Sequence, residues 1–174
     1  IDSYPWKHWK SIEAQTDIEN VRVDLVDIWH FLLSLTLEHF EMNEAQELLQ
    51  KSLHETVFEE QAMSVIEQVK VHEELMSIAL ERSSVDDVFI KRLVSAFLHS
   101  CHISELTFGQ LYQIYMAKNV LNKFRQDHGY KEGEYIKLWD GKEDNVVMFE
   151  IIEKMDVFSG DALYISLKAA YSQL

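Results

Sequence analysis

Cysteine, proline and glycine are scarce in this sequence, with one Cys, one Pro and five Gly among 174 residues. The lone cysteine, Cys101, cannot form an intramolecular disulfide, which excludes a disulfide-stapled miniprotein. The scarcity of proline and glycine favours long helices over many short strands. Long hydrophobic runs are also missing, because residues 28–37 are interrupted by three polar residues, so we expect no membrane span.

Basic residues are few as well. Lys and Arg number 16 against 30 Asp and Glu, which gives a net charge of -14 and argues against a general nucleic-acid or membrane-surface binder. Hydrophobic residues make up 47% and aromatic residues 11% of the chain, enough for a folded core despite the charge. We therefore expect a soluble, cytoplasmic protein that forms a single domain over residues 1–174.

The charge is unevenly distributed along the chain. Residues 117–142 carry six basic and four acidic side chains, a local balance of +2, which leaves the rest of the chain at -16. The same stretch contains Gly129, Gly133 and Gly141. We expect a mobile, glycine-containing cationic loop here, and its charge suits a small anion better than a long polyanion.

Helical patterns cover most of the chain. Apolar spacing predicts helices at about residues 17–40, 43–54, 57–82, 84–102, 108–128, 146–155 and 161–172. Thr16 with Glu19 and Thr107 with Gln110 form capping-box patterns, and Asn43 is a candidate cap for the second helix. We expect no strand. The predicted architecture is an all-α helical bundle.

Two acidic residues share a face of the first predicted helix. Asp24 and Asp27 are at i and i+3, in a segment otherwise rich in apolar residues. Carboxylates in an apolar setting are costly unless a cation or a donor compensates them. Their oxygens suit Mg²⁺ or Mn²⁺. Alternatively, the two acids face solvent or pair with Arg22 and a neighbouring helix.

A cationic face follows on the fifth predicted helix. Lys118, Asn122 and Arg125 are at i, i+4 and i+7, in its last turns. Arginine and lysine fit phosphate oxygens, and an amide can read the edge of a base. Alternatively, the cations complement the helix dipole and pair with acidic loop residues, namely Glu132, Glu134 and Asp140. Together with the acidic pair, this face indicates a site for a metal-bound nucleotide.

Three segments resemble the dimeric, all-α dUTPases of some bacteria and kinetoplastids, which belong to the all-α NTP pyrophosphatases. They are IDSYPWKHWK (1–10), ENVRVDLVDIWHFLLSL (19–35) and KNVLNKFRQDHGYKEGEYIKLWDGKEDN (118–145). The resemblance implies a helical bundle of that type, with a rigid and a mobile part, that acts as a homodimer. It also implies Mg²⁺-dependent hydrolysis of dUTP to dUMP and pyrophosphate, and leaves open the hydrolysis of dUDP to dUMP and phosphate.

Site residues follow from the same resemblance. The metal ligands fall on Asp24 and Asp27, the first of which is more often Glu in the family. Asn122 matches the amide that reads uracil, and His30 and Phe31 would flank the nucleoside, although core packing is the alternative for Phe31. The phosphate-binding residues fall on Lys118, Arg125, Tyr130, Lys137 and Asn145.

One departure from the family concerns its ExxE motif, which precedes the segment that opens this sequence. Neither that motif nor the earlier base-contacting Gln and Asn residues are present, and the chain starts at Ile1 without Met. We expect these residues, including the Glu that activates water, upstream of Ile1. The resemblance implies attack by water on the β-phosphate, and no Ser or Cys nucleophile with a paired base is visible.

Two further functions stay open. The chain could be an all-α nucleotide pyrophosphatase with another preference, such as dCTP or a broad set of nucleotides. It could also be a non-catalytic helical interaction module. Release of pyrophosphate from individual nucleotides separates these functions from dUTP hydrolysis.

Overall fold

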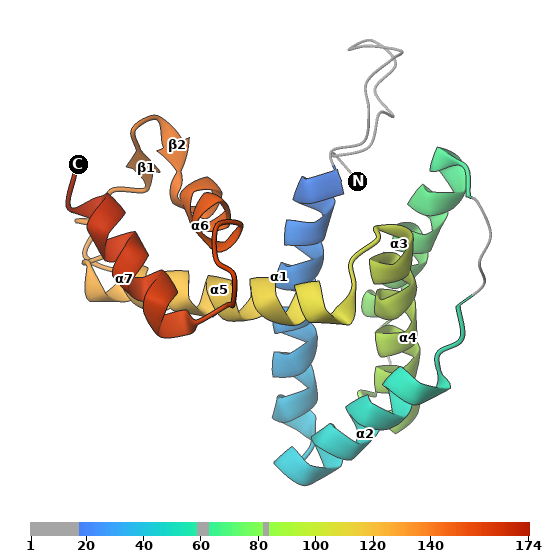
Figure 1. Cartoon of the computed structure of the whole chain (residues 1–174). Helices are drawn as coiled ribbons and strands as arrows, with labels where there is room; N and C mark the ends of the chain where they lie inside the picture. Colours follow the sequence, from blue (N-terminus) through green and yellow to red (C-terminus); the bar gives the residue numbers. More distant parts are fainter. Residues whose placement is uncertain (1–17, 59–62, 82–83) are drawn as a thin grey trace. The chain divides into compact units, whose positions relative to one another are not determined.

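The computed structural model describes residues 18–58, 63–81 and 84–174 (Figure 1). These residues form seven helices and one two-stranded hairpin, which confirms the all-α class. They divide between Phe108 and Gly109 into two compact units, described separately below. A single domain over residues 1–174 stays a prediction. None of the described helices is long and apolar enough to cross a membrane.

The first unit contains α1 (Ile18–His39), α2 (Met42–Glu55), α3 (Val65–Ala79) and α4 (Asp87–Ile103) (Figure 1). Helix α4 packs against the other three, and about half of its residues are apolar and buried. Trp29 of α1 stacks on Phe97 of α4, with 5.2 Å between ring centroids. Trp29 is buried in this core.

Two helices, α2 and α3, start at other residues than predicted, because capping boxes determine their first turns. Helix α2 begins after Glu41 and not at Asn43, because the Glu44 carboxylate accepts a hydrogen bond from the Glu41 backbone N–H at 3.4 Å. Helix α3 begins eight residues later than predicted, after Ser64, which forms a capping box with Glu67. The start of α1 agrees with prediction, but its expected capping box lies outside the described residues.

The second unit follows in chain order with α5 (Phe108–Asp127), β1 (Leu138–Trp139), β2 (Lys142–Glu143), α6 (Asp144–Ile152) and α7 (Gly160–Tyr171) (Figure 1). Its hydrophobic core contains residues from one face of each helix and the indole ring of Trp139 from the hairpin. The buried members are Ala117, Leu121, Phe124, Trp139, Met148, Ile152, Leu163 and Leu167. This core fixes the C-terminal half of α5, which carries the predicted cationic face.

The hairpin contradicts the prediction that the chain has no strand. Its two strands are antiparallel, with Leu138 opposite Glu143, and Trp139 is buried. At the turn, Asp140 and Gly141 have φ of 48° and 83°. Positive φ at both central residues is what a tight hairpin turn requires, and Asp-Gly is the dipeptide that adopts it most readily. Strands of two residues are too short to show an alternating pattern.

Gly129 ends helix α5, as predicted. Its φ is +79°, and the N–H of Tyr130 returns to the carbonyl of Arg125 at 3.0 Å. Glycine adopts this left-handed conformation without steric cost, which makes it a frequent helix stop. The glycine-containing cationic loop therefore begins where the sequence places it, and its mobility stays a prediction.

Candidate functional site

The candidate site residues fall into two groups. Asp24, Asp27, His30 and Phe31 lie on α1 in the first unit. The second unit carries Lys118, Asn122, Arg125, Tyr130, Lys137 and Asn145. Each group is described within its own unit.

Asp24 and Asp27 lie one helical turn apart on α1. Asp24 is exposed and Asp27 half-buried, while Leu25 and Val26 between them are buried. Arg22, the alternative partner, donates from Nε to the carbonyl of Ser104 at 3.0 Å and from Nη2 to that of Glu105 at 3.3 Å. Its guanidinium is thus directed toward the end of α4.

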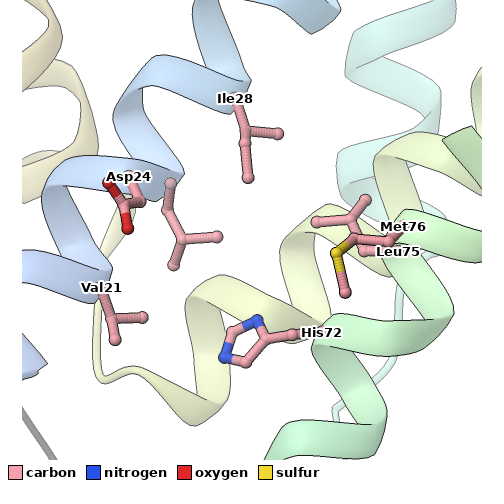
Figure 2. A pocket seen from close by; sticks show the side chains of 7 residues that line it. Val21, Asp24, Ile28, His72, Leu75 and Met76 are labelled. Atoms are coloured by element: carbon pink, nitrogen blue, oxygen red, sulfur yellow. The ribbon is translucent and has the colours of Figure 1, made fainter. Parts of the chain in front are cut away.

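Asp24 borders a pocket of about 130 Å³ between residues of α1 and α3 (Figure 2). His72 of α3 is the other polar residue in its lining. Burial lowers the pKa of His72 to about 4, so its imidazole is neutral at physiological pH. The other lining residues are Val21, Leu25, Ile28, Leu75 and Met76. We did not predict His72, whose only sequence signal is a histidine among the apolar positions of α3.

An apolar groove of about 490 Å³ adjoins this pocket. It shares Ile28, Leu75 and Met76 with the pocket and extends along α1 past Phe31. Phe31 is 75% exposed, so the alternative that it packs in the core is wrong. An exposed aromatic ring in an apolar groove is typical of a surface that another molecule covers.

His30 follows on the same helix. Its Nδ1 lies 3.0 Å from the carbonyl oxygen of Val26, and because a carbonyl only accepts, Nδ1 carries the hydrogen. In the neutral ring, Nε2 is then an acceptor. His39, His99 and His128 make the same bond to the carbonyl four residues earlier, so it is a helix feature and no signature of a site.

The two aspartates fit part of a site for a hard divalent cation. Their carboxylate oxygens are the donors that Mg²⁺ prefers, but the ion takes about six ligands and usually keeps several waters. The described part of the chain contains no group of three or more His, Cys, Asp or Glu residues placed to hold a metal. Any further ligands would be water, substrate phosphates or groups outside the described residues.

The second unit brings three predicted residues together. Arg125 donates from Nη1 to the Oδ1 of Asn122 at 3.1 Å, and its Cζ lies 5.9 Å from the ring centroid of Tyr130. Lys118, one helical turn before Asn122, is buried, whereas Asn122 is exposed. The spacing of three residues on α5 agrees with the contact between Asn122 and Arg125, and the roles of these residues stay predictions.

Asp144, the first residue of α6, is fully buried and holds the guanidinium of Arg125. Its carboxylate accepts hydrogen bonds from Nε and Nη2 of Arg125 at 2.7 Å each, and from the hydroxyl of Tyr135 at 2.8 Å. The backbone N–H of Asn145 donates to the same carboxylate at 2.8 Å. This is a bidentate ion pair with its remaining acceptor sites filled.

The electrostatics keep this ion pair charged. Burial alone would raise the pKa of Asp144, but the hydrogen bonds from Arg125 and Tyr135 outweigh it and hold the pKa below its usual range. The hydrogen bond to Asp144 in turn raises the pKa of Arg125. Burial, together with the hydrogen bond to Asp144, raises the pKa of Tyr135.

The acidic partner of Arg125 is thus Asp144, and not one of the loop acids that the alternative interpretation named. The loop acids in question were Glu132, Glu134 and Asp140. Asp144 belongs to the EDN sequence that closes the third resembling segment, which was the available signal for it. A carboxylate in the first turn of a helix is also favoured by the helix dipole.

A comparison with protein families shows that residues 1–130 match the dUTPase family. The chain belongs to this family. A comparison with the curated proteins found no match. The family match confirms the resemblance and the expected enzyme class: this dUTPase hydrolyses dUTP, and its substrate is a nucleotide. Enzymes of the family generally use a divalent metal ion.

The matched part of the dUTPase ends at Tyr130, so Lys137 and Asn145 lie beyond it. The ammonium of Lys137 lies 3.6 Å from the Glu143 carboxylate, and both side chains are about half exposed, which makes a weak surface pair. Oδ1 of Asn145 is buried and has no hydrogen-bond partner within the described residues. This amide therefore retains an acceptor that a ligand group or water can satisfy.

Proposed function

We propose that this dUTPase hydrolyses Mg²⁺-bound dUTP to dUMP and pyrophosphate, and dUDP to dUMP and phosphate, by attack of water. The observation that carries the proposal is the position of Asp24 at a pocket that adjoins an apolar groove, in a chain of the dUTPase family. A carboxylate would approach the phosphate oxygens only through a bound metal ion, and an apolar groove suits the nucleoside.

Asp24 and Asp27 are the proposed metal ligands. Mg²⁺ fits their oxygens, and Mn²⁺ is the alternative ion. When bound, the metal would supply positive charge next to the phosphates and a water of lowered pKa. The two side chains share one face of α1, so a single helix turn would present both carboxylates. Aspartate in place of the family's more frequent Glu changes the reach of this ligand and not its chemistry.

The phosphate chain is assigned to the cations and donors of the second unit. The proposed set is Lys118, Arg125, Tyr130, Lys137 and Asn145. Arg125 has five N–H donors, three of which bind Asp144 and Asn122. The remaining donors are available to a phosphate, and the Asp144 carboxylate keeps the guanidinium in place while they bind. Neutralising the phosphate charge in this way stabilises the transition state.

The nucleoside is assigned to three residues. Asn122 would read the uracil edge, and Phe31 would pack on the sugar, which agrees with its exposure in the apolar groove. His30 would flank the nucleoside beside Phe31, and its Nδ1–H is bound by the carbonyl of Val26. No described residue is assigned the role of water-activating base.

We also propose that the enzyme acts as a homodimer in the cytoplasm, as the resemblance implies. The exposed apolar residues near α1, including Phe31 and Leu37, are consistent with a surface that is covered in the working enzyme. Light scattering of the full-length protein at micromolar concentration measures this directly. A mass of one chain would contradict the homodimer.

The proposed activity is tested with the full-length protein and each of dUTP, dTTP, dCTP, dATP and dGTP. Pyrophosphate is quantified with Mg²⁺, with Mn²⁺ and with a chelator. Release from dUTP alone, dependent on Mg²⁺, is the expected result. Release from other nucleotides would indicate a different preference, and no release would favour a non-catalytic interaction module.

A further inference from the structure

Three side chains of the second unit form a chain of contacts, here called the relay: Asp144, Arg125 and Asn122. Asp144 binds two nitrogens of Arg125, and a third nitrogen of Arg125 donates to Oδ1 of Asn122. The buried end of the relay is Asp144, at 0% exposure, and the exposed end is Asn122. The relay thus connects the buried carboxylate of Asp144 to Asn122, the side chain that is assigned to the uracil base.

Arg125 determines which way the amide of Asn122 is turned. A guanidinium has donors and no acceptor, so the atom of Asn122 that faces it must be the carbonyl oxygen. One lone pair of Oδ1 is then occupied by Arg125, and the Nδ2 group, which has only donors, is fixed on the opposite side of the amide. Without Arg125, rotation of the amide would present either its oxygen or its nitrogen.

Asp144 in turn prevents Arg125 from turning away. Its carboxylate occupies both Nε and Nη2 of the guanidinium at 2.7 Å. Tyr135 and the backbone N–H of Asn145 bind the same carboxylate, so the carboxylate itself is fixed by groups from the loop and from α6. Because the guanidinium is planar and is bound through Nε and Nη2, the position of its third nitrogen, Nη1, is fixed as well.

An amide nitrogen that faces position 4 of the base distinguishes uracil from cytosine. Uracil has a carbonyl acceptor at position 4, where cytosine has an amino donor, and two donors that face each other cannot form a hydrogen bond. Thymine presents the same carbonyl as uracil at this edge. We propose that Asp144 is a positioning residue that, through Arg125, fixes Asn122 as a donor and so favours uracil over cytosine. This inference rests on the proposed function.

The test compares kcat/KM for dUTP, dCTP and dTTP in the full-length wild type and in Asp144→Asn. We expect the dUTP to dCTP ratio to fall about tenfold, the value of one hydrogen bond, while the dUTP to dTTP ratio stays unchanged. Adding Asn122→Ala to Asp144→Asn should lower the dUTP to dCTP ratio no further, because both changes remove the same discrimination. Calorimetric binding of dUMP and dCMP without metal should show the same change.

Two further variants test the same proposal in case Asp144→Asn does not fold. Arg125→Lys keeps the positive charge but cannot bind Asp144 and Asn122 together, so it should lower the dUTP to dCTP ratio as Asp144→Asn does. Tyr135→Phe removes one donor to Asp144 and keeps the ring, and it should give a smaller fall in the same direction. A fall in the ratio in these variants supports the relay even if Asp144→Asn does not fold.

The matched control is Lys123→Gln, which breaks an ion pair with Asp127 on the same helix. It should leave both ratios at their wild-type values. If Asp144→Asn and Arg125→Lys lower activity on all three nucleotides equally, Asp144 is only structural and the proposal is overturned. A wild type that does not prefer dUTP to dCTP would overturn the proposed function as well, whereas an intact preference that the variants leave unchanged would overturn the relay alone.

Discussion

Asp24 of α1 and His72 of α3 line the same pocket, one with a carboxylate and the other with a buried imidazole (Figure 2). Burial lowers the pKa of His72 to about 4, while an unfolded histidine titrates near pH 6.5. Between these two values the unfolded chain binds more protons than the folded one, so the free energy of unfolding decreases as the pH falls.

We therefore expect wild-type protein to lose on the order of 2 kcal/mol of stability between pH 6.5 and pH 4 from His72 alone. His72→Gln removes the titrating group and should flatten the dependence on pH. Urea denaturation at a series of pH values in metal-free buffer measures the difference. His39→Gln, an exposed histidine on α1, should keep the wild-type slope. Parallel curves for wild type and His72→Gln would show that His72 does not titrate in this window.

The sequence predicts most helix ends of this dUTPase from local signals, but it misses the start of α3, which the capping box of Ser64 and Glu67 determines. Gly129 stops α5, and Ser159 caps α7 with its side chain, both within a residue or two of prediction. The hairpin was missed because its strands are too short for a period of two residues. The only signal for it was the Asp140-Gly141 dipeptide.

Site residues on one helix were also predictable. Asn122 and Arg125 are neighbours on α5 because they are three residues apart, and the structure confirms their contact. Asp144 lies 19 residues beyond Arg125, and their pairing depends on how α6 packs against α5. The positions of Asp144 and His72 are set by tertiary packing, which helical periodicity does not encode.

The acidic pair gives a second prediction. Asp24→Asn and Asp27→Asn keep the side-chain shape but remove a charged oxygen donor, so each should lower metal-dependent dUTP hydrolysis about a hundredfold or more. Circular dichroism should show unchanged helicity, since Asp24 is exposed and Asp27 half-buried. Glu55→Gln, an exposed acidic residue at the end of α2, is the control and should retain wild-type turnover. Wild-type turnover in either aspartate variant would refute the metal assignment.

The backbone of Gly129 gives a third prediction. Its φ is +79°, and an added Cβ would lie 2.9 Å from the Cβ of Glu134. Gly129→Ala should therefore destabilise the protein by roughly 1–2 kcal/mol or more. Gly109→Ala, within α5 and with nothing near an added Cβ, should instead stabilise by about 0.5–1 kcal/mol. Chemical denaturation of the two variants would contradict this account if both changed stability in the same direction.

The last prediction concerns the cationic loop. Gly129, Gly133 and Gly141 all have positive φ, and Lys137 is exposed, so residues between α5 and α6 lack a helical framework and carry solvent-exposed charge. Asp144 and the buried Trp139 tie the end of this segment to the core. We expect hydrogen exchange within residues 118–145 to be fastest between 129 and 143 without nucleotide, and slow in the helical residues on either side.

A non-hydrolysable dUTP analogue with Mg²⁺ should slow exchange in residues 129–143, because a polyanion would hold the loop cations in one arrangement. Peptides from α4 serve as the internal control and should exchange equally in both states, since α4 is the buried helix of the other unit. The matched dCTP analogue should protect the loop less, as the proposed base preference requires. Equal protection of residues 129–143 with and without the dUTP analogue would mean that the loop does not close on the phosphates, and Lys137 would then lose its assigned role.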